Sequence, residues 1–193
     1  YGTKKACEPI QLIYNYKDRA VYAVNEGKET KDVVATVKVY DAESKLLFED
    51  TRTFTSAYRK NVKAFDLAKF NGRPHFVALE VADVDGKVIT DNFYCVGAKP
   101  NVYSWKDFTW YNTLILEYTD LSFAFAQPEA EVEMTVKENN GTYEVTLVNK
   151  SDVISFMNIL KAKDAAGNMV VPAYWSDNFF SLLPGQTKTV TCE

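Results

Sequence analysis

The sequence predicts an all-β protein made of two immunoglobulin-like β-sandwiches in tandem. Short runs that alternate between apolar and polar residues recur along the chain, with turn residues between them at intervals of roughly eight to twelve residues. No amphipathic helical pattern separates these runs. Asn140-Gly141 lies between two alternating runs, which is the strongest hairpin signal in the chain.

The first sandwich is predicted within residues 1–127. Pro9 ends any helix near the N-terminus, because the residue before a proline disfavours helical backbone. Asn71-Gly72 marks a turn, and the alternating run that starts at His75 is followed by a hairpin loop over residues 83–86. Seven strands are expected, over residues 10–16, 20–25, 33–40, 46–55, 61–70, 75–81 and 88–96.

Residues 97–127 are expected to form an aromatic segment that links the two sandwiches. The segment shows little strict alternation, so only a strand over 110–116 and a short helical turn near 119–121 are predicted in it. Its large aromatic residues are Tyr103, Trp105, Phe108, Trp110, Tyr111, Tyr118, Phe123 and Phe125.

The second sandwich, residues 128–193, is predicted to be the smaller one. Strands over 132–137 and 143–148 flank the Asn-Gly turn, and further strands are expected over 153–162 and 169–171. Pro172 lacks a backbone donor, which places it at an edge or a bend. Pro184-Gly185 supplies a tight turn into a closing strand over 187–192.

Composition excludes several classes of function. The net charge is −4, with 22 basic and 26 acidic residues, so the basic surface needed for a nucleic-acid partner is absent. No apolar run reaches about 18 residues, so no membrane partner is expected. Cys7, Cys95 and Cys192 are widely spaced, and a single histidine accompanies them, so neither a metal nor a cofactor is expected. Each cysteine is interpreted as a small buried apolar residue, with a Cys7–Cys95 disulfide as the alternative.

Local motifs give no catalytic residue. His75 is not accompanied by a G-x-S-x-G nucleophile elbow, so it is not expected to be a catalytic base. The run Asp83-Val84-Asp85-Gly86 lacks the other ligands of a calcium-binding loop and is expected to be a hairpin turn. Asn140-Gly141-Thr142 and Asn149-Lys150-Ser151 match glycosylation sequons, a pattern that is common by chance.

Two stretches resemble a known enzyme family. The run Pro172–Gly185, preceded by residues 148–156, resembles the C-terminal immunoglobulin-like domain of family 2 glycoside hydrolases, in the β-mannosidase and exo-β-D-glucosaminidase branch. Residues 1–9 resemble the segment that leaves the catalytic barrel of that family. The resemblance implies a non-catalytic C-terminal region of a periplasmic or secreted retaining glycosidase, with the catalytic barrel of the same parent chain as its partner.

The chain itself is expected to be inactive. Retaining hydrolysis uses two carboxyl groups about 5 Å apart. The family carries them on a barrel of about 250 residues with alternating helices. The present sequence is shorter and lacks those helices, and its acidic residues fall at predicted turns or on the polar side of strands.

The candidate carbohydrate contacts are Tyr174, Trp175, Asp177 and Asn178. Aromatic rings stack on the C–H faces of sugars, while carboxylates and amides bind sugar hydroxyls, and these residues supply both kinds of group. The alternative for Trp175 is packing in the core or between domains.

A competing function is an autonomous carbohydrate-binding module. In that interpretation Trp105, Trp110 and Trp175 form an aromatic platform for an oligosaccharide. An adhesion or scaffold role follows from the fold alone.

Overall fold

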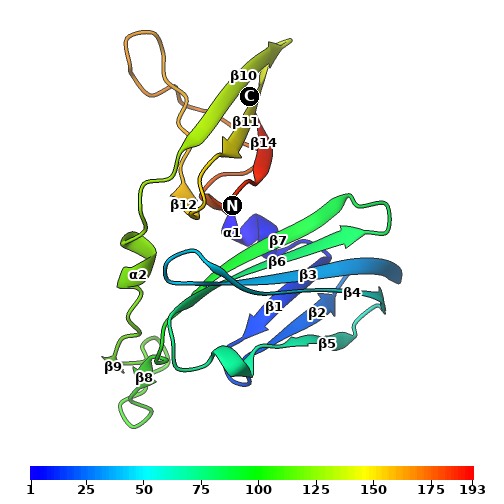
Figure 1. Cartoon of the computed structure of the whole chain (residues 1–193), viewed down its shortest axis with the longest axis vertical. Coiled ribbons are helices and arrows are strands. Elements are labelled where there is room, and N and C mark those ends of the chain that lie inside the picture. The colour runs from blue at the N-terminus through cyan, green and yellow to red at the C-terminus, as the bar shows by residue number, and fades with distance from the viewer. The chain divides into compact units, whose positions relative to one another are not determined.

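The computed structural model describes residues 1–193 and confirms the all-β class (Figure 1). Its helices are short: α1 (Gly2–Ala6), the 3₁₀ helix η1 (Ala68–Phe70) and α2 (Ser122–Phe125). None of these helices is long or apolar enough to cross a membrane. The chain divides into a larger unit, residues 4–126, and a smaller unit, residues 127–193 together with residues 1–3.

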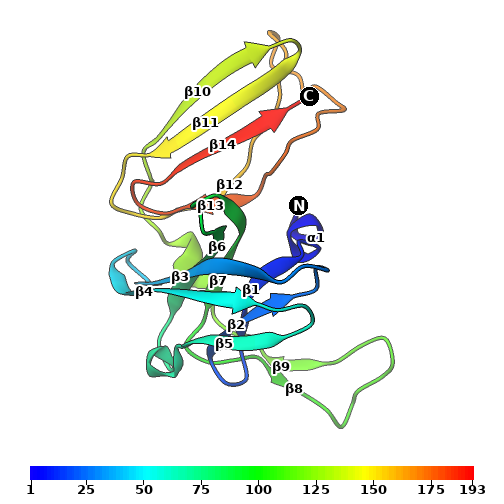
Figure 2. The same ribbon diagram turned by 90° about the vertical axis from the view of Figure 1, so that its right-hand side faces the viewer.

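The larger unit is a sandwich of two antiparallel sheets (Figure 2). One sheet has the order β1-β2-β5, formed by Ile10–Asn15, Ala20–Asn25 and Asn61–Asp66. The other has the order β4-β3-β6-β7, formed by Leu46–Ser56, Lys31–Asp41, His75–Asp83 and Val88–Val96. These seven strands fall where the alternating runs predict them, and the run at 61–70 divides into β5 and η1.

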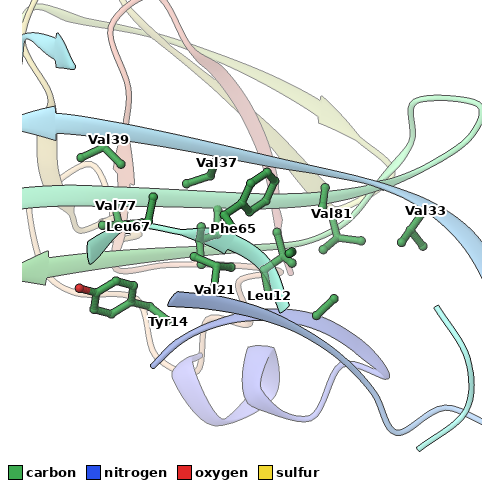
Figure 3. Close-up of a cluster of buried hydrophobic side chains, with 14 of the residues drawn as sticks. Leu12, Tyr14, Val21, Val33, Val37, Val39, Phe65, Leu67, Val77 and Val81 are labelled. Atoms are coloured by element: carbon green, nitrogen blue, oxygen red, sulfur yellow. The ribbon is translucent and has the colours of Figure 1, made fainter. Parts of the chain in front are cut away.

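Alternation along the strands builds the core of the larger unit. In β3, Val33, Ala35, Val37 and Val39 are all buried, because every second side chain of a strand points to the same face. These residues belong to one apolar cluster with Leu12, Val21 and Phe65 of the other sheet (Figure 3).

His75 lies within this unit as a structural residue. Its Nδ1 is 2.9 Å from the carbonyl oxygen of Arg73, to which a protonated Nδ1 donates, and its ring packs against Phe70. The other ring nitrogen, Nε2, is buried without a hydrogen-bond partner. Desolvation by burial is the main cause that lowers the pKa of His75 below 6.5.

The folded state therefore disfavours the charged imidazole. Since the unfolded chain binds the proton more readily, the contribution of His75 to stability is complete above about pH 7 and declines as the pH falls through 6.5. His75 is the only histidine, so an NMR titration gives one imidazole resonance to follow. We expect its pKa below 6.5, and a value of 6.5 or higher would contradict this burial argument.

The smaller unit has a three-stranded and a two-stranded sheet. The first has the order β10-β11-β14, formed by Val132–Asn139, Thr142–Asn149 and Thr187–Cys192. The second pairs β12 with β13, formed by Ser155–Asn158 and Phe180–Leu182. The core consists of Val145, Leu147, Phe180, Leu182 and Val190.

Several predicted elements differ from the structure. The strand expected over 153–162 is reduced to β12, because the side chain of Asn178 takes both the N–H and the carbonyl oxygen of Leu160 in place of a strand. The strand expected over 169–171 is a single bridge between Lys163 and Met169. All three cysteines are free. Cys192 is buried as expected, whereas Cys95 is only partly buried and Cys7 is exposed.

A buried asparagine closes each sandwich. Asn25 ends β2, and its amide donates to the carbonyl oxygens of Ser56 and Glu29 at 2.8 and 3.0 Å while its oxygen accepts from Gly27. Asn149 ends β11 and uses the same arrangement. Its amide donates to Val153, Leu182 and Leu183, and its oxygen accepts from Ser151.

Burial of Asn149 also decides the status of one sequon. Its side chain is wholly inaccessible and its amide nitrogen is engaged in hydrogen bonds, so it offers no nitrogen for attachment of a glycan. Asn140, in contrast, lies at the exposed β10–β11 turn with a positive φ of 51°.

Candidate functional site

The predicted carbohydrate segment runs beside the last strand of the smaller unit. Tyr174 and Glu193 exchange two backbone hydrogen bonds, and Ser176 N–H donates to the carbonyl oxygen of Thr191. Trp175 is thereby placed opposite Cys192. Because side chains alternate along an extended segment, Trp175 turns inward onto the core, whereas the Tyr174 ring is 69% exposed.

Asp177 and Asn178 make structural contacts. Asp177 forms a 2.9 Å ion pair with Lys188, whose ammonium also lies over the ring of Phe180. The oxygen of the buried Asn178 accepts from the Leu160 N–H at 2.8 Å, and its amide donates to the Leu160 carbonyl at 2.9 Å. Of the four predicted contacts, the side chain of Tyr174 is the most accessible to a ligand, and the role of all four in sugar binding stays a prediction.

A second aromatic surface lies in the larger unit, on a hairpin over residues 102–117. Its short strands β8 (Val102–Tyr103) and β9 (Ile115–Glu117) pair at the base. The strand expected over 110–116 therefore begins later, because residues 109–112 form the tip through two hydrogen bonds between Thr109 and Asn112. Figure 2 shows this hairpin extending away from the sheets of the larger unit. We call residues 102–117 the aromatic arm.

The sequence anchors the base of the aromatic arm. A side chain at Gly97 would place its Cβ 2.2 Å from the Thr119 hydroxyl and 2.8 Å from the Asp120 carbonyl oxygen, so only glycine permits the close approach. Asn101 accepts a hydrogen bond from the Thr119 N–H. Phe123 of α2 then packs on Phe76 of β6, which fixes the chain beyond the arm to the sandwich.

Aromatic rings at the end of the arm are open to solvent. Trp110 is 89% exposed and Trp105 is 73% exposed. Trp110 and Tyr111 meet edge to face with their centroids 5.2 Å apart, and Tyr103 lies 5.8 Å from Trp105. Exposed aromatic rings gathered on one segment are typical of surfaces that bind a protein or a ligand. The sequence pointed to the aromatic residues of this segment but not to their projection on an arm.

Aspartates serve turns in this chain. Asp41, Asp83 and Asp164 each accept hydrogen bonds from the N–H groups two and four residues later, at 2.8 to 3.1 Å. The side chain of Asn168 is the main cause that lowers the pKa of Asp164. A general acid needs the opposite shift. No group of three or more His, Cys, Asp or Glu side chains is arranged to hold a metal ion.

Two family descriptions match successive parts of the chain. Residues 17–98 match the mannosidase Ig/CBM-like domain, and residues 110–193 match the exo-beta-D-glucosaminidase Ig-fold domain. The chain consists of immunoglobulin-fold domains of the exo-β-D-glucosaminidase and mannosidase family.

Curated relatives agree with this assignment. An exo-β-D-glucosaminidase from Amycolatopsis orientalis is 29% identical over 205 residues, covering all of this chain and 20% of the relative. One from Arthroderma benhamiae is 31% identical over 190 residues, covering 95% of this chain and 21% of the relative. The chain thus spans about a fifth of the length of these glucosaminidases.

Solved structures share the fold. The crystal structure of the exo-chitosanase CsxA from Amycolatopsis orientalis has a TM-score of 0.84 at 27% identity, over all of this chain and 24% of that one. A β-D-mannosidase from Dictyoglomus thermophilum has a TM-score of 0.68 at 17% identity over the whole chain and 20% of that one, a likeness of fold alone.

The expected C-terminal position in the parent chain is not borne out. The matches support a coarser statement, that these immunoglobulin-fold domains are a small part of a larger chain. We therefore withdraw the C-terminal placement and keep the domain identity. The residues that carried the resemblance identify the domains and not their place along the enzyme.

Substitutions within the predicted segment separate structural from exposed positions. Asn178→Ala should lower the free energy of unfolding by about 1–3 kcal/mol, because it leaves the buried N–H and carbonyl of Leu160 without their partner. Tyr174→Ala should change it by less than about 0.5 kcal/mol, since the ring is largely exposed. Urea denaturation of both variants measures the difference. Equal effects would contradict this division of roles.

Proposed function

We propose that this chain is the non-catalytic immunoglobulin-fold region of an exo-β-D-glucosaminidase or β-mannosidase type of glycoside hydrolase. It supports a catalytic barrel carried by the same parent chain, which acts in the periplasm or outside the cell, as the family resemblance implies. The domain matches and the share of the relatives that the chain spans support this proposal.

The aromatic arm is the observation that carries the supporting role. Its exposed rings include Trp105, Phe108, Trp110 and Tyr111. Fully burying a large apolar side chain contributes about 2 kcal/mol, so an arm left in water forgoes several kcal/mol that contact with a neighbouring domain would supply. The relatives have about four-fifths of their length outside the matched region, which offers such a neighbour.

A second candidate function is carbohydrate binding by the chain alone. The faces of Trp110 and Tyr111 are accessible, and sugars stack on such faces. The platform of three tryptophans is less favoured, since Trp175 packs on the core of the smaller unit.

Activity assays test the non-catalytic role. The isolated chain should release no 4-nitrophenol from 4-nitrophenyl β-D-glucosaminide or β-D-mannoside, whereas the parent enzyme should hydrolyse one of them. Turnover by the purified chain at a rate proportional to its concentration would overturn the proposal.

Substitutions in the aromatic arm test the supporting role. Trp110→Ala with Tyr111→Ala should lower the melting temperature of the parent enzyme by several degrees and leave that of the isolated chain unchanged, because both rings are exposed in the isolated chain. Tyr58→Ala, at an exposed turn elsewhere in the larger unit, is the matched control. An unchanged melting temperature of the parent enzyme would contradict docking of the aromatic arm on a neighbouring domain. Tryptophan fluorescence that saturates with chito-oligosaccharide and is lost in the arm variant would favour sugar binding instead.

A further inference from the structure

The smaller unit leaves one strip of its inner sheet face uncovered. Met134 and Val136 of β10 pair with Leu147 and Val145 of β11, and paired residues place their side chains on the same face. Leu147 and Val145 are each 4% exposed, whereas Met134 is 57% exposed and Val136 is 52% exposed. The opposing β12–β13 sheet therefore covers β11, whereas of β10 only Val132 packs against the core, and Met134 and Val136 stay open.

The same strand is also the edge of its sheet. In the order β10-β11-β14, β10 has a neighbour on one side only, and Figure 2 shows no strand beyond it. An edge strand presents backbone N–H and carbonyl groups that another strand can bind. β10 thus combines an open edge with an uncovered apolar strip, which are the two requirements for adding a strand to the sheet.

The sequence of β10 is complementary to itself when it runs antiparallel. Centred on Thr135, the pairing sets Glu133 opposite Lys137 twice, Met134 opposite Val136 twice and, near the ends of the strand, Val132 opposite Glu138 twice. Lys137 already lies across from Glu144 of β11, so it would stand between two carboxylates of the extended sheet. Opposite charges placed directly across a strand pair stabilise it, and like charges destabilise it.

Neighbouring registers are poorer. A centre on Glu133 or Lys137 sets like charges opposite one another, and a centre on Val136 sets Lys137 opposite Thr135, so that no opposite charges meet. A centre on Met134 sets Glu133 opposite Thr135 and leaves Lys137 opposite Glu131, which lies outside the strand. If the two-fold axis passes between two residues, even-numbered residues lie opposite odd-numbered ones. The second copy is then turned over, and its apolar face lies beside the polar face of the first.

We propose that β10 is a self-association surface, on which two copies of this chain join their three-stranded sheets into one continuous sheet centred on Thr135. The two apolar strips then lie side by side and shield each other from water. A second copy is the occupant that fits, because the complementary charges and the matching faces both come from this one strand. The inference is independent of the proposed function.

Charge reversals test this register. Sedimentation analysis of the isolated chain over a concentration series should show a reversible dimer. Glu133→Lys alone and Lys137→Glu alone each create two like-charge pairs and should weaken dimerisation by about tenfold or more. The double variant restores both pairs and should return to within about threefold of the original affinity. Lys161→Glu, at an exposed loop position of the same unit, is the control for net charge.

Mixing the two single variants gives the sharpest result. A Glu133→Lys copy and a Lys137→Glu copy are complementary to each other, so the mixture should dimerise although neither variant does so well alone. Far-UV circular dichroism verifies that each variant is folded. A chain that stays monomeric, a dimer that is insensitive to the single reversals, or a double variant weaker than the singles would overturn the proposal.

Discussion

One buried carboxamide at the end of a strand holds each sandwich closed. Asn25 in the larger unit and Asn149 in the smaller unit bind backbone carbonyl groups of loops and of strand ends. Removing either amide would take the donor from two or three backbone carbonyl groups, one hydrogen bond of each set being buried, which costs more than the loss of a surface hydrogen bond. Each residue thereby joins the two sheets of its sandwich, because Asn25 of β2 binds Ser56 of β4 and Asn149 of β11 binds Leu182 of β13.

The regular part of the fold follows from sequence. Alternation such as that of Val33 to Val39 predicts both a strand and its buried face, since the period of two is a local property. Where the structure differs from the predicted elements, the causes are nonlocal contacts. The strand expected through Leu160 is shortened because a residue 18 positions later supplies its hydrogen bonds. The shape of the aromatic arm depends on the close passage of Thr119 by Gly97, which no local pattern encodes.

The candidate site was predictable in composition and less so in geometry. Residues 174–178 do contain exposed and polar groups. Asp177, however, forms an ion pair with Lys188, and the side chain of Asn178 accepts a hydrogen bond from the backbone of Leu160. Side chains that suit a sugar also suit a turn, and the sequence does not distinguish the two uses. The exposed rings of the aromatic arm, in contrast, contact one another, and Trp110 at the tip is 89% exposed beside Tyr111. The surfaces that we propose for interaction therefore lie on a projection and on a sheet edge, while the core residues stabilise the fold.

Hydrogen exchange on Asn149→Ala tests the closing role of the buried carboxamide most directly. The account expects amide protection to fall in the segments that Asn149 holds, around Ser151 to Val153 and Leu182 to Leu183, and in the adjoining strands β11 and β14. Asn25→Ala should have the equivalent effect around Gly27, Glu29 and Ser56. Protection that is unchanged in both variants would contradict the claim that these two side chains close the sandwiches.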